Sequence, residues 1–137
     1  MDHRRRFSAF VAKGEEPRDA ILGALEFTTQ FLPETSIKER ARIKAAVIVE
    51  EIVSNSLRHG GKDRDLNIGL TLDDIGDALV IEMEDDGAEF DSSDSQEFDG
   101  PDPHTGGGIG LAIVRAWGED ITYTRTRERN LLRLTIR

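Results

Sequence analysis

The sequence has 137 residues and a formal net charge of −9, from 27 acidic and 18 basic side chains, and it contains no cysteine. The lack of cysteine excludes disulfides, thiol nucleophiles and thiolate zinc sites, and the acidic charge disfavours nucleic-acid binding, which needs a basic face. The chain has neither an apolar run near the roughly 20 residues of a membrane span nor the apolar core of a signal peptide. We therefore expect a single soluble, cytoplasmic domain over residues 1–137, with no nucleic acid and no membrane among its partners.

The first part of the chain predicts a strand followed by two helices. Residues 6–13, "RFSAFVAK", are rich in aromatic and β-branched side chains and stop at "GEEP", which is typical of a strand. Pro17 suits the first turn of a helix that ends before the next proline. Ser36 and Glu39 form a capping-box pattern for a second helix, which is expected to run to about Leu57 and to stop at "HGGK".

The second part of the chain predicts four strands, a long loop and one more helix. The strands are expected over residues 66–74, 78–86, 121–126 and 131–137. Residues 86–108 are rich in Gly, Asp, Ser and Pro and are expected to form a loop, whereas residues 109–117, "IGLAIVRAW", return to helix. The predicted fold class is α+β: a two-layer α/β sandwich with a mixed, mainly antiparallel sheet and helices on one face.

Three polar side chains recur at intervals of four along the second predicted helix. Glu51, Asn55 and His59 fall within an arc of about 80° on a helix that is otherwise largely apolar. A solvated edge of a packed helix is the simpler explanation of such a stripe. As the floor of a pocket, the stripe would offer an amide oxygen suited to Mg²⁺ and, one turn earlier, a carboxylate able to polarise a nucleophile. The neighbouring Glu50 points about 100° away and is expected to be structural or solvated.

One predicted strand places a carboxylate on its core face. Leu79, Ile81, Met83 and Asp85 share parity, so all four are expected on the same side of the sheet. A buried carboxylate is costly unless a donor satisfies it, and an acceptor-only group in a slot suits the exocyclic amine of adenine. Gly87, two residues on, would let something flat approach the backbone. The alternative is an ordinary "DDG" turn at the end of a strand.

A glycine-rich stretch precedes the last predicted helix. In "HTGGGIGLAIVRAW", residues 104–117, glycines gather at the mouth of a helix, where backbone N–H groups and the helix dipole favour an anion. The spacing matches neither the Rossmann glycine pattern nor a Walker loop, since no GK[ST] follows. A flexible turn is the plainer explanation of the glycines by themselves.

In order and separation, these signals resemble one family over nearly the whole chain. The Bergerat-fold ATPases, which include relatives of gyrase, histidine kinases and MutL, carry similar boxes, and the likeness is strongest to the small anti-sigma-factor serine/threonine kinases. "EIVSNSLRH" is similar to their N box, E-x-x-x-N-x-x-x-H. "DDGAEFD" resembles their first glycine box, "GGGIGLAIVRAW" the second, and "ITYTRTRERNLLRLTIR" their closing hairpin with its Asn.

The resemblance implies a role for each matched residue. Glu51 would be the general base, Asn55 the Mg²⁺ ligand, and Asp85 the reader of the adenine amine. The other nucleotide contacts would come from Gly87, Gly106, Gly108, Gly110 and Leu111. ATP and Mg²⁺ are therefore the implied cofactors, and residues 91–107 would form the ATP lid.

The resemblance also implies partners and leaves a second function open. Such kinases phosphorylate a Ser or Thr of a small antagonist protein and otherwise hold a sigma factor, usually as a dimer. The expected lid is acidic, however, and residues 88–114 contain no Lys or Arg, so Arg58, Lys62 or Arg115 would have to balance the triphosphate. A non-catalytic interaction module on the same fold is the alternative. A histidine kinase fragment and a metal hydrolase are less favoured, because the three histidines lack the necessary placement.

Overall fold

A computed structural model of the chain describes residues 3–61, 63–89 and 109–137, with residues 109–111 described for their backbone alone. Five strands form one sheet: β1 (Arg4–Val11), β2 (Leu66–Asp74), β3 (Leu79–Asp85), β4 (Glu119–Thr126) and β5 (Arg129–Ile136). Their spatial order is β1-β2-β3-β5-β4, and all four pairings between them are antiparallel. The sequence predicted a mixed, mainly antiparallel sheet, and the described strands pair in the antiparallel sense only.

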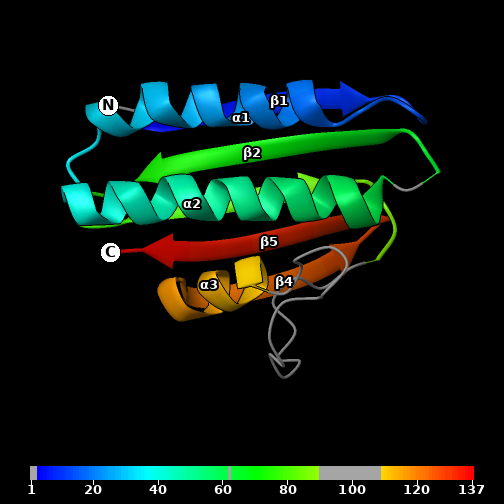
Figure 1. Ribbon diagram of the computed structural model, residues 1–137. Coiled ribbons are helices and arrows are strands. Elements are labelled where there is room, and N and C mark those ends of the chain that lie inside the picture. The colour runs from blue at the N-terminus through cyan, green and yellow to red at the C-terminus, as the bar shows by residue number, and fades with distance from the viewer. Residues whose placement is uncertain (1–2, 62, 90–108) are drawn as a thin grey trace.

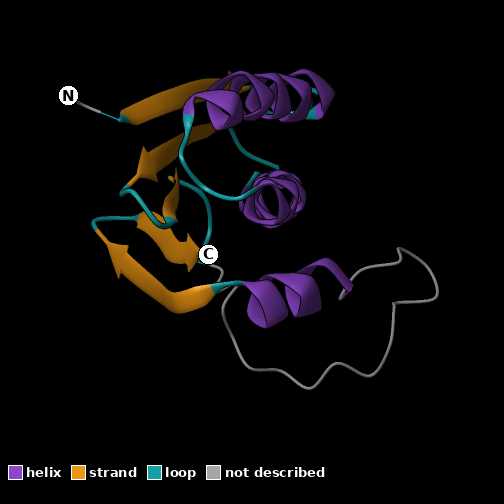
Figure 2. Ribbon diagram, turned by 90° about the vertical axis from the view of Figure 1, so that its left-hand side faces the viewer, coloured by secondary structure: helices purple, strands orange, loops and turns teal. Residues whose placement is uncertain are grey.

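Three helices cover one face of this sheet: α1 (Arg18–Phe31), α2 (Glu39–Asn55) and α3 (Ile109–Trp117). Figure 1 shows α2 running along the middle of the sheet, with α1 and α3 on either side of it. In the turned view all three helices lie on one side and all the strands on the other (Figure 2). The α+β sandwich with helices on one face is therefore confirmed.

The core lies between these two layers and follows from the alternation along the strands. Phe7, Leu70, Met83 and Leu132 are paired in sequence across β1, β2, β3 and β5 and point toward the helices. From the other layer α2 buries seven side chains, including Ile48 and Ile52. Fully burying one such side chain contributes roughly 1.5–3 kcal/mol, so α2 is fixed mainly by packing on the sheet.

The predicted capping box at the start of α2 is wrong. The helix begins at Glu39 after Lys38, and no side chain caps its first turn. Ser36 instead donates its hydroxyl to the Gly76 carbonyl oxygen at 2.6 Å, and its backbone N–H donates to an Asp74 carboxylate oxygen at 3.1 Å. A tertiary contact with the β2–β3 turn thus engages the hydroxyl that a local pattern assigned to the helix.

The far end of α2 departs from regular helix. The α-helical part ends at Asn55, and a π-helical turn continues from Ser56 to Gly60. A π turn widens the helix by one residue and is often found where a helix contributes to a functional site. Here the π-helical turn brings Gly60 close to Asp85 at the end of β3.

The closing hairpin is tighter than expected. The sequence predicted a connection over residues 127–130, but β4 and β5 pair up to Thr126 and Arg129, leaving Arg127 and Glu128 as the turn. Both turn residues have positive φ, 52° and 63°, a conformation in which glycine and asparagine are far more common. The short turn fixes the register of β4 on β5, so Arg125 lies opposite Asn130.

Candidate functional site

Asp85 lies on the helix-facing side of the sheet, as its parity with Leu79, Ile81 and Met83 predicted. Its side chain is only 6% exposed. The register places it in one row with Asn130 of β5 and Arg125 of β4, so three polar side chains from three adjacent strands face the helix layer at one end of the sheet. Such a row ends the hydrophobic core with groups that must satisfy one another.

One carboxylate oxygen of Asp85 accepts two hydrogen bonds. The Gly87 backbone N–H donates to Oδ1 at 2.9 Å, and the Asn130 amide nitrogen donates to the same oxygen at 2.8 Å. Within the described residues, no donor reaches Oδ2. Since Asp85 has one satisfied and one open acceptor, it can take a hydrogen bond from a donor on a ligand.

Arg125 and Tyr123 complete this end of the site, and the sequence did not predict either of them. The Tyr123 hydroxyl donates to Asn130 Oδ1 at 2.6 Å, and Arg125 Nη1 donates to the same oxygen at 3.0 Å. Arg125 Nη1 also donates to the Gly87 carbonyl oxygen at 2.9 Å, and Asn130 Nδ2 to that of Ala88 at 2.8 Å. The signal that would have found both residues is the alternation in "TYTRT", read together with a two-residue turn.

Gly60 and Gly87 bring two backbones into contact beside Asp85. A Cβ atom at Gly87 would lie 2.5 Å from the Gly60 Cα and carbonyl oxygen, and one at Gly60 would lie 3.2 Å from Asp85 Oδ1. Gly87 therefore has a steric reason to be glycine, namely the π-helical turn after α2, apart from the role beside the base that the resemblance implied. This contact could not be predicted from the sequence, because a π turn has no simple pattern.

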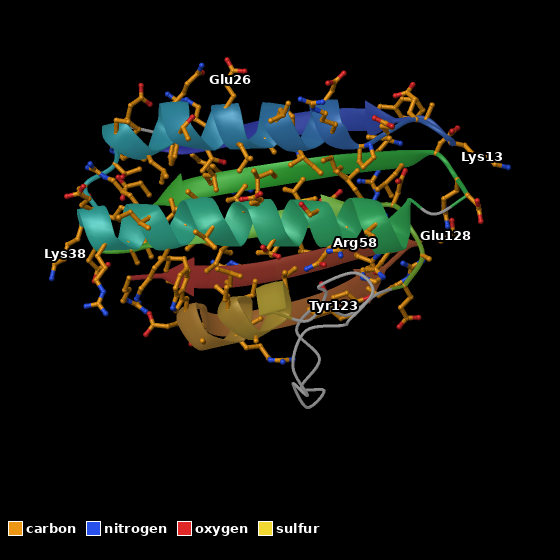
Figure 3. All side chains as sticks on the ribbon, in the orientation of Figure 1. Lys13, Glu26, Lys38, Arg58, Tyr123 and Glu128 are labelled. Atoms are coloured by element: carbon orange, nitrogen blue, oxygen red, sulfur yellow. The ribbon has the colours of Figure 1, made fainter. Side chains whose placement is uncertain are left out.

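Asn55 lies on the last turn of α2 and is 4% exposed, and only one of its two amide atoms has a hydrogen-bond partner among the described residues. Arg58 Nη2 donates to Asn55 Oδ1 at 2.7 Å, whereas the Asn55 amide nitrogen is buried without a hydrogen-bond partner. Figure 3 shows Arg58 at the end of the molecule that also carries Lys13 and the Glu128 turn, away from Lys38. A buried orphan of this kind costs about 1–3 kcal/mol, so the site retains an unsatisfied group for which the described contacts offer no compensation.

The other two members of the predicted stripe are less buried than Asn55. Glu51 is half-buried, and no hydrogen bond engages it within the described part of the chain. His59 is exposed in the π-helical turn, where partial burial and then the Arg58 charge lower its pKa from the ordinary value of 6.5. Glu50 is exposed, as expected. The stripe thus separates into a buried amide, a half-buried carboxylate and a neutral surface imidazole.

The glycine-rich stretch can be followed only in part. Gly106, Gly108 and the expected lid over residues 91–107 fall outside the described residues. Gly110 and Leu111 belong to the first turn of α3, and α3 packs against α2. The backbone of that turn is therefore carried by a helix that neighbours the one bearing Asn55 and Glu51.

The oxygen donors present suit a hard cation with few protein ligands. No group of three or more His, Asp or Glu side chains is placed to hold a metal anywhere in the described residues. Mg²⁺ keeps several waters and uses one or two protein oxygens together with substrate phosphates. Asn55 Oδ1 is such an oxygen, and the orphaned amide nitrogen beside it marks a polar position that a hydrated ion with its ligand would satisfy.

The opposite face of the sheet carries charges that pair within the sheet. Arg129 forms an ion pair with Glu84, and Arg133 Nε lies 3.7 Å from Glu82 Oε1. A hollow of about 560 Å³ lies there, beside Arg6, whose guanidinium covers Gly69. Paired cross-strand charges of this kind are usual on a solvated sheet face.

Comparisons with known proteins agree with this architecture. A family model described as the histidine kinase-like ATPase domain matches residues 15–136. Among solved structures, the histidine kinase AdeS of Acinetobacter baumannii matches with a TM-score of 0.51 and 15% sequence identity, over 96% of this chain and 68% of that chain. At that identity the likeness shows the fold alone. A comparison with curated proteins returned no match. As far as the chain is described, none of its helices has the length and apolar character needed to cross a bilayer.

Proposed function

Because the chain belongs to the histidine kinase-like ATPase family and is thereby an ATP-binding, kinase-like domain, we propose that it is a serine/threonine protein kinase of the anti-sigma-factor type. In this proposal it binds Mg²⁺-ATP and transfers the γ-phosphoryl group to a small antagonist protein. The single observation that carries the proposal is the buried carboxylate of Asp85, of which one oxygen accepts two hydrogen bonds and the other has no donor among the described residues.

The base end of the nucleotide is assigned to Asp85. Its Oδ1 is saturated by Gly87 and Asn130, so Oδ2 is the acceptor available to the exocyclic amine of adenine. Contacts within the protein hold this carboxylate in place, and an acceptor that is already positioned binds at lower entropic cost than one that must be ordered. The backbones of Gly60, after α2, and Gly87 are in close contact beside this carboxylate.

The phosphate end is assigned to the end of α2 and the first turn of α3. Asn55 would hold Mg²⁺ through Oδ1, and the ion, when bound, would neutralise charge on the β- and γ-phosphates. Arg58 donates to that oxygen, so its guanidinium is within reach of the same region and supplies a cation for the phosphates once the oxygen is taken. Gly110 and Leu111 present the backbone of a helix N-terminus, which favours an anion.

Glu51 is assigned the role of general base, which accepts the proton of the attacking hydroxyl group. A Ser or Thr hydroxyl must lose its proton as its oxygen attacks the γ-phosphorus and the bond to the β–γ bridging oxygen breaks, releasing ADP. Glu51 lies one turn before Asn55, half-buried and without a hydrogen bond among the described residues, so its carboxylate is available to accept that proton.

The wider role follows from the family resemblance of the three boxes. The antagonist protein would be the phosphorylated substrate, and a sigma factor or related regulator would be the protein held in its absence, in the cytoplasm and with a homodimer as the working form. A non-catalytic interaction module is the second candidate. The observations that favour it are the lack of Lys and Arg from 88 to 114 and the occupation of Asn55 Oδ1 by Arg58.

The test begins with nucleotide binding and then separates binding from transfer. Thermal unfolding of the purified chain should shift upward with ATP and Mg²⁺, because a ligand that binds only the folded state stabilises it. Glu51→Ala should abolish transfer of labelled phosphate to a candidate antagonist while keeping this shift, and Glu50→Ala, its exposed neighbour, should leave both unchanged. Asp85→Asn should remove most of the shift, since it places an amide nitrogen among the donors around Asp85. No shift in the unmodified chain would favour the interaction module.

A further inference from the structure

The contacts behind Asp85 reach further than the carboxylate itself. Asp85, Asn130 and Arg125 occupy one row across β3, β5 and β4, and Tyr123 lies two residues along β4 on the same face. Asn130 is 4% exposed and links Asp85 to the two β4 side chains. These four side chains form one connected network of hydrogen bonds.

The orientation of the Asn130 amide is fixed by its neighbours. Its oxygen accepts from Arg125, which is a donor only, and from the Tyr123 hydroxyl. Its nitrogen faces two acceptors, Asp85 Oδ1 and the Ala88 carbonyl oxygen, so both amide hydrogens are used. Reversing the amide would set its oxygen against a carboxylate and a carbonyl, and its nitrogen against a guanidinium.

Arg125 also holds the backbone that follows β3. The same Nη1 atom that donates to Asn130 donates to the Gly87 carbonyl oxygen, 38 residues away in sequence. Gly87 in turn donates its N–H to Asp85 and contacts the Gly60 backbone. One guanidinium therefore fixes both the amide and the main chain on which the open oxygen of Asp85 depends.

The chemical result is a point in the pocket that can accept a hydrogen bond and cannot donate one. Asp85 Oδ2 is an acceptor, and both N–H groups of Asn130 are already used. The 6-amino group of adenine donates to such a point. The 6-oxo group of hypoxanthine or guanine brings a second acceptor there, and the mismatch leaves a polar group unpaired.

We propose that Arg125, assisted by Tyr123, is a positioning residue of the base pocket: by holding the Asn130 amide and the Gly87 carbonyl, it fixes the two groups that bind Asp85 Oδ1, keeps Oδ2 in place as the acceptor for the base, and so sets selectivity for a 6-amino over a 6-oxo purine nucleotide. The inference rests on the proposed ATP-binding function. Without Arg125, the Asn130 oxygen and the Gly87 carbonyl oxygen each lose a donor, so the amide and the backbone that bind Asp85 Oδ1 are less firmly fixed, and Oδ2 is held less firmly in the position that favours a 6-amino group.

The experiment compares ATP with ITP, in which a 6-oxo group and an N1–H replace the 6-amino group and the unprotonated N1 of adenine, by isothermal titration calorimetry with Mg²⁺. The unmodified chain should bind ATP more tightly than ITP. Arg125→Met should reduce the ratio of the two affinities by about tenfold, which corresponds to the loss of roughly one hydrogen bond. Arg125→Lys should restore part of the ratio, because an ammonium group still donates. Arg127→Met, in the exposed turn of the same hairpin, should leave the ratio unchanged.

The outcomes separate this inference from the proposed function. If the unmodified chain binds neither nucleotide, the proposed function fails, and the inference fails with it before any variant is made. If Arg125→Met weakens ATP and ITP equally, Arg125 merely supports the fold and the inference is overturned. Should Arg125→Met fail to fold by circular dichroism, Tyr123→Phe, which removes one donor to Asn130, must still lower the ratio by about threefold for the inference to stand.

Discussion

The two ends of the candidate cleft are built differently. At the base end, Asp85, Asn130 and Arg125 share a connected set of hydrogen bonds: each amide atom of Asn130 has two partners, and Asp85 Oδ2 is the acceptor left without a donor among the described residues. At the phosphate end, the Asn55 amide nitrogen is buried without a partner. The difference indicates that the fold prepares the base pocket in advance, whereas the groups assigned to the metal and phosphates gain their full complement of contacts only with a ligand.

The largest expected effect on stability comes from substituting Asn130 at the base end. Asn130→Leu should lower the free energy of unfolding by about 3 kcal/mol, because Asp85 Oδ1 and Arg125 Nη1 each lose one of their two partners and the Ala88 carbonyl oxygen loses its donor. Urea unfolding measures the change. A loss below about 1 kcal/mol would mean that solvent satisfies these groups.

Gly87→Ala should have the next largest effect. Its Cβ would lie 2.5 Å from two backbone atoms of Gly60, which cannot move without shifting the π-helical turn, so we expect a loss of roughly 1–3 kcal/mol and weaker ATP binding. Gly60→Ala is the matched control. Its Cβ would lie 3.2 Å from Asp85 Oδ1, so the neighbouring atoms would have to move less than those around an alanine at position 87. Equal destabilisation by the two variants would contradict the steric account.

At the phosphate end, a substitution of Asn55 should change the free energy of unfolding in the opposite direction. Asn55→Leu should raise the free energy of unfolding by about 1 kcal/mol, because it replaces a buried, unpartnered amide nitrogen with apolar volume, while Arg58 returns to solvent. The same variant should lose the thermal shift with Mg²⁺ and ATP. If Asn55→Leu is instead destabilised as strongly as Asn130→Leu, the two ends do not differ in the way described.

The smallest expected effect concerns pH. Burial, and then the Arg58 charge, lower the pKa of His59 in the folded chain, so the unfolded chain takes up the proton first as the pH falls through about 6.5. Stability should therefore decrease from pH 7.5 toward the lowered folded pKa and then level off. Because the ring is exposed to water, the part due to His59 should be a few tenths of a kcal/mol. Urea midpoints of His59→Gln at pH 7.5 and 5.5 should lack this part.

Local pattern was enough to predict the fold and the acidic side chain of the base pocket. Alternation placed Asp85 on the core face, whereas the four-residue spacing left Asn55 either on a solvated edge of the helix or on the floor of a pocket, and the structure buries it. The capping prediction failed because Ser36 bonds to a turn about 40 residues away. Arg125 and Tyr123 were missed because their role depends on the register of three strands, and that register depends on a turn, Arg127–Glu128, whose residues are unusual for its conformation. The Gly60 contact depends on a π turn.

The strand order also governs when a binding pocket can first exist. β5 is made after every other element, yet it takes an interior position between β3 and β4. A chain still emerging from the ribosome can align β1, β2 and β3, but the flank of β3 stays bare, and Asp85 has no amide beside it until residue 130 has left the exit tunnel. If ATP is bound through Asp85 as proposed, its capture must wait until β5 has been made, and a chain that terminates before β5 lacks Asn130, whose amide donates to Asp85.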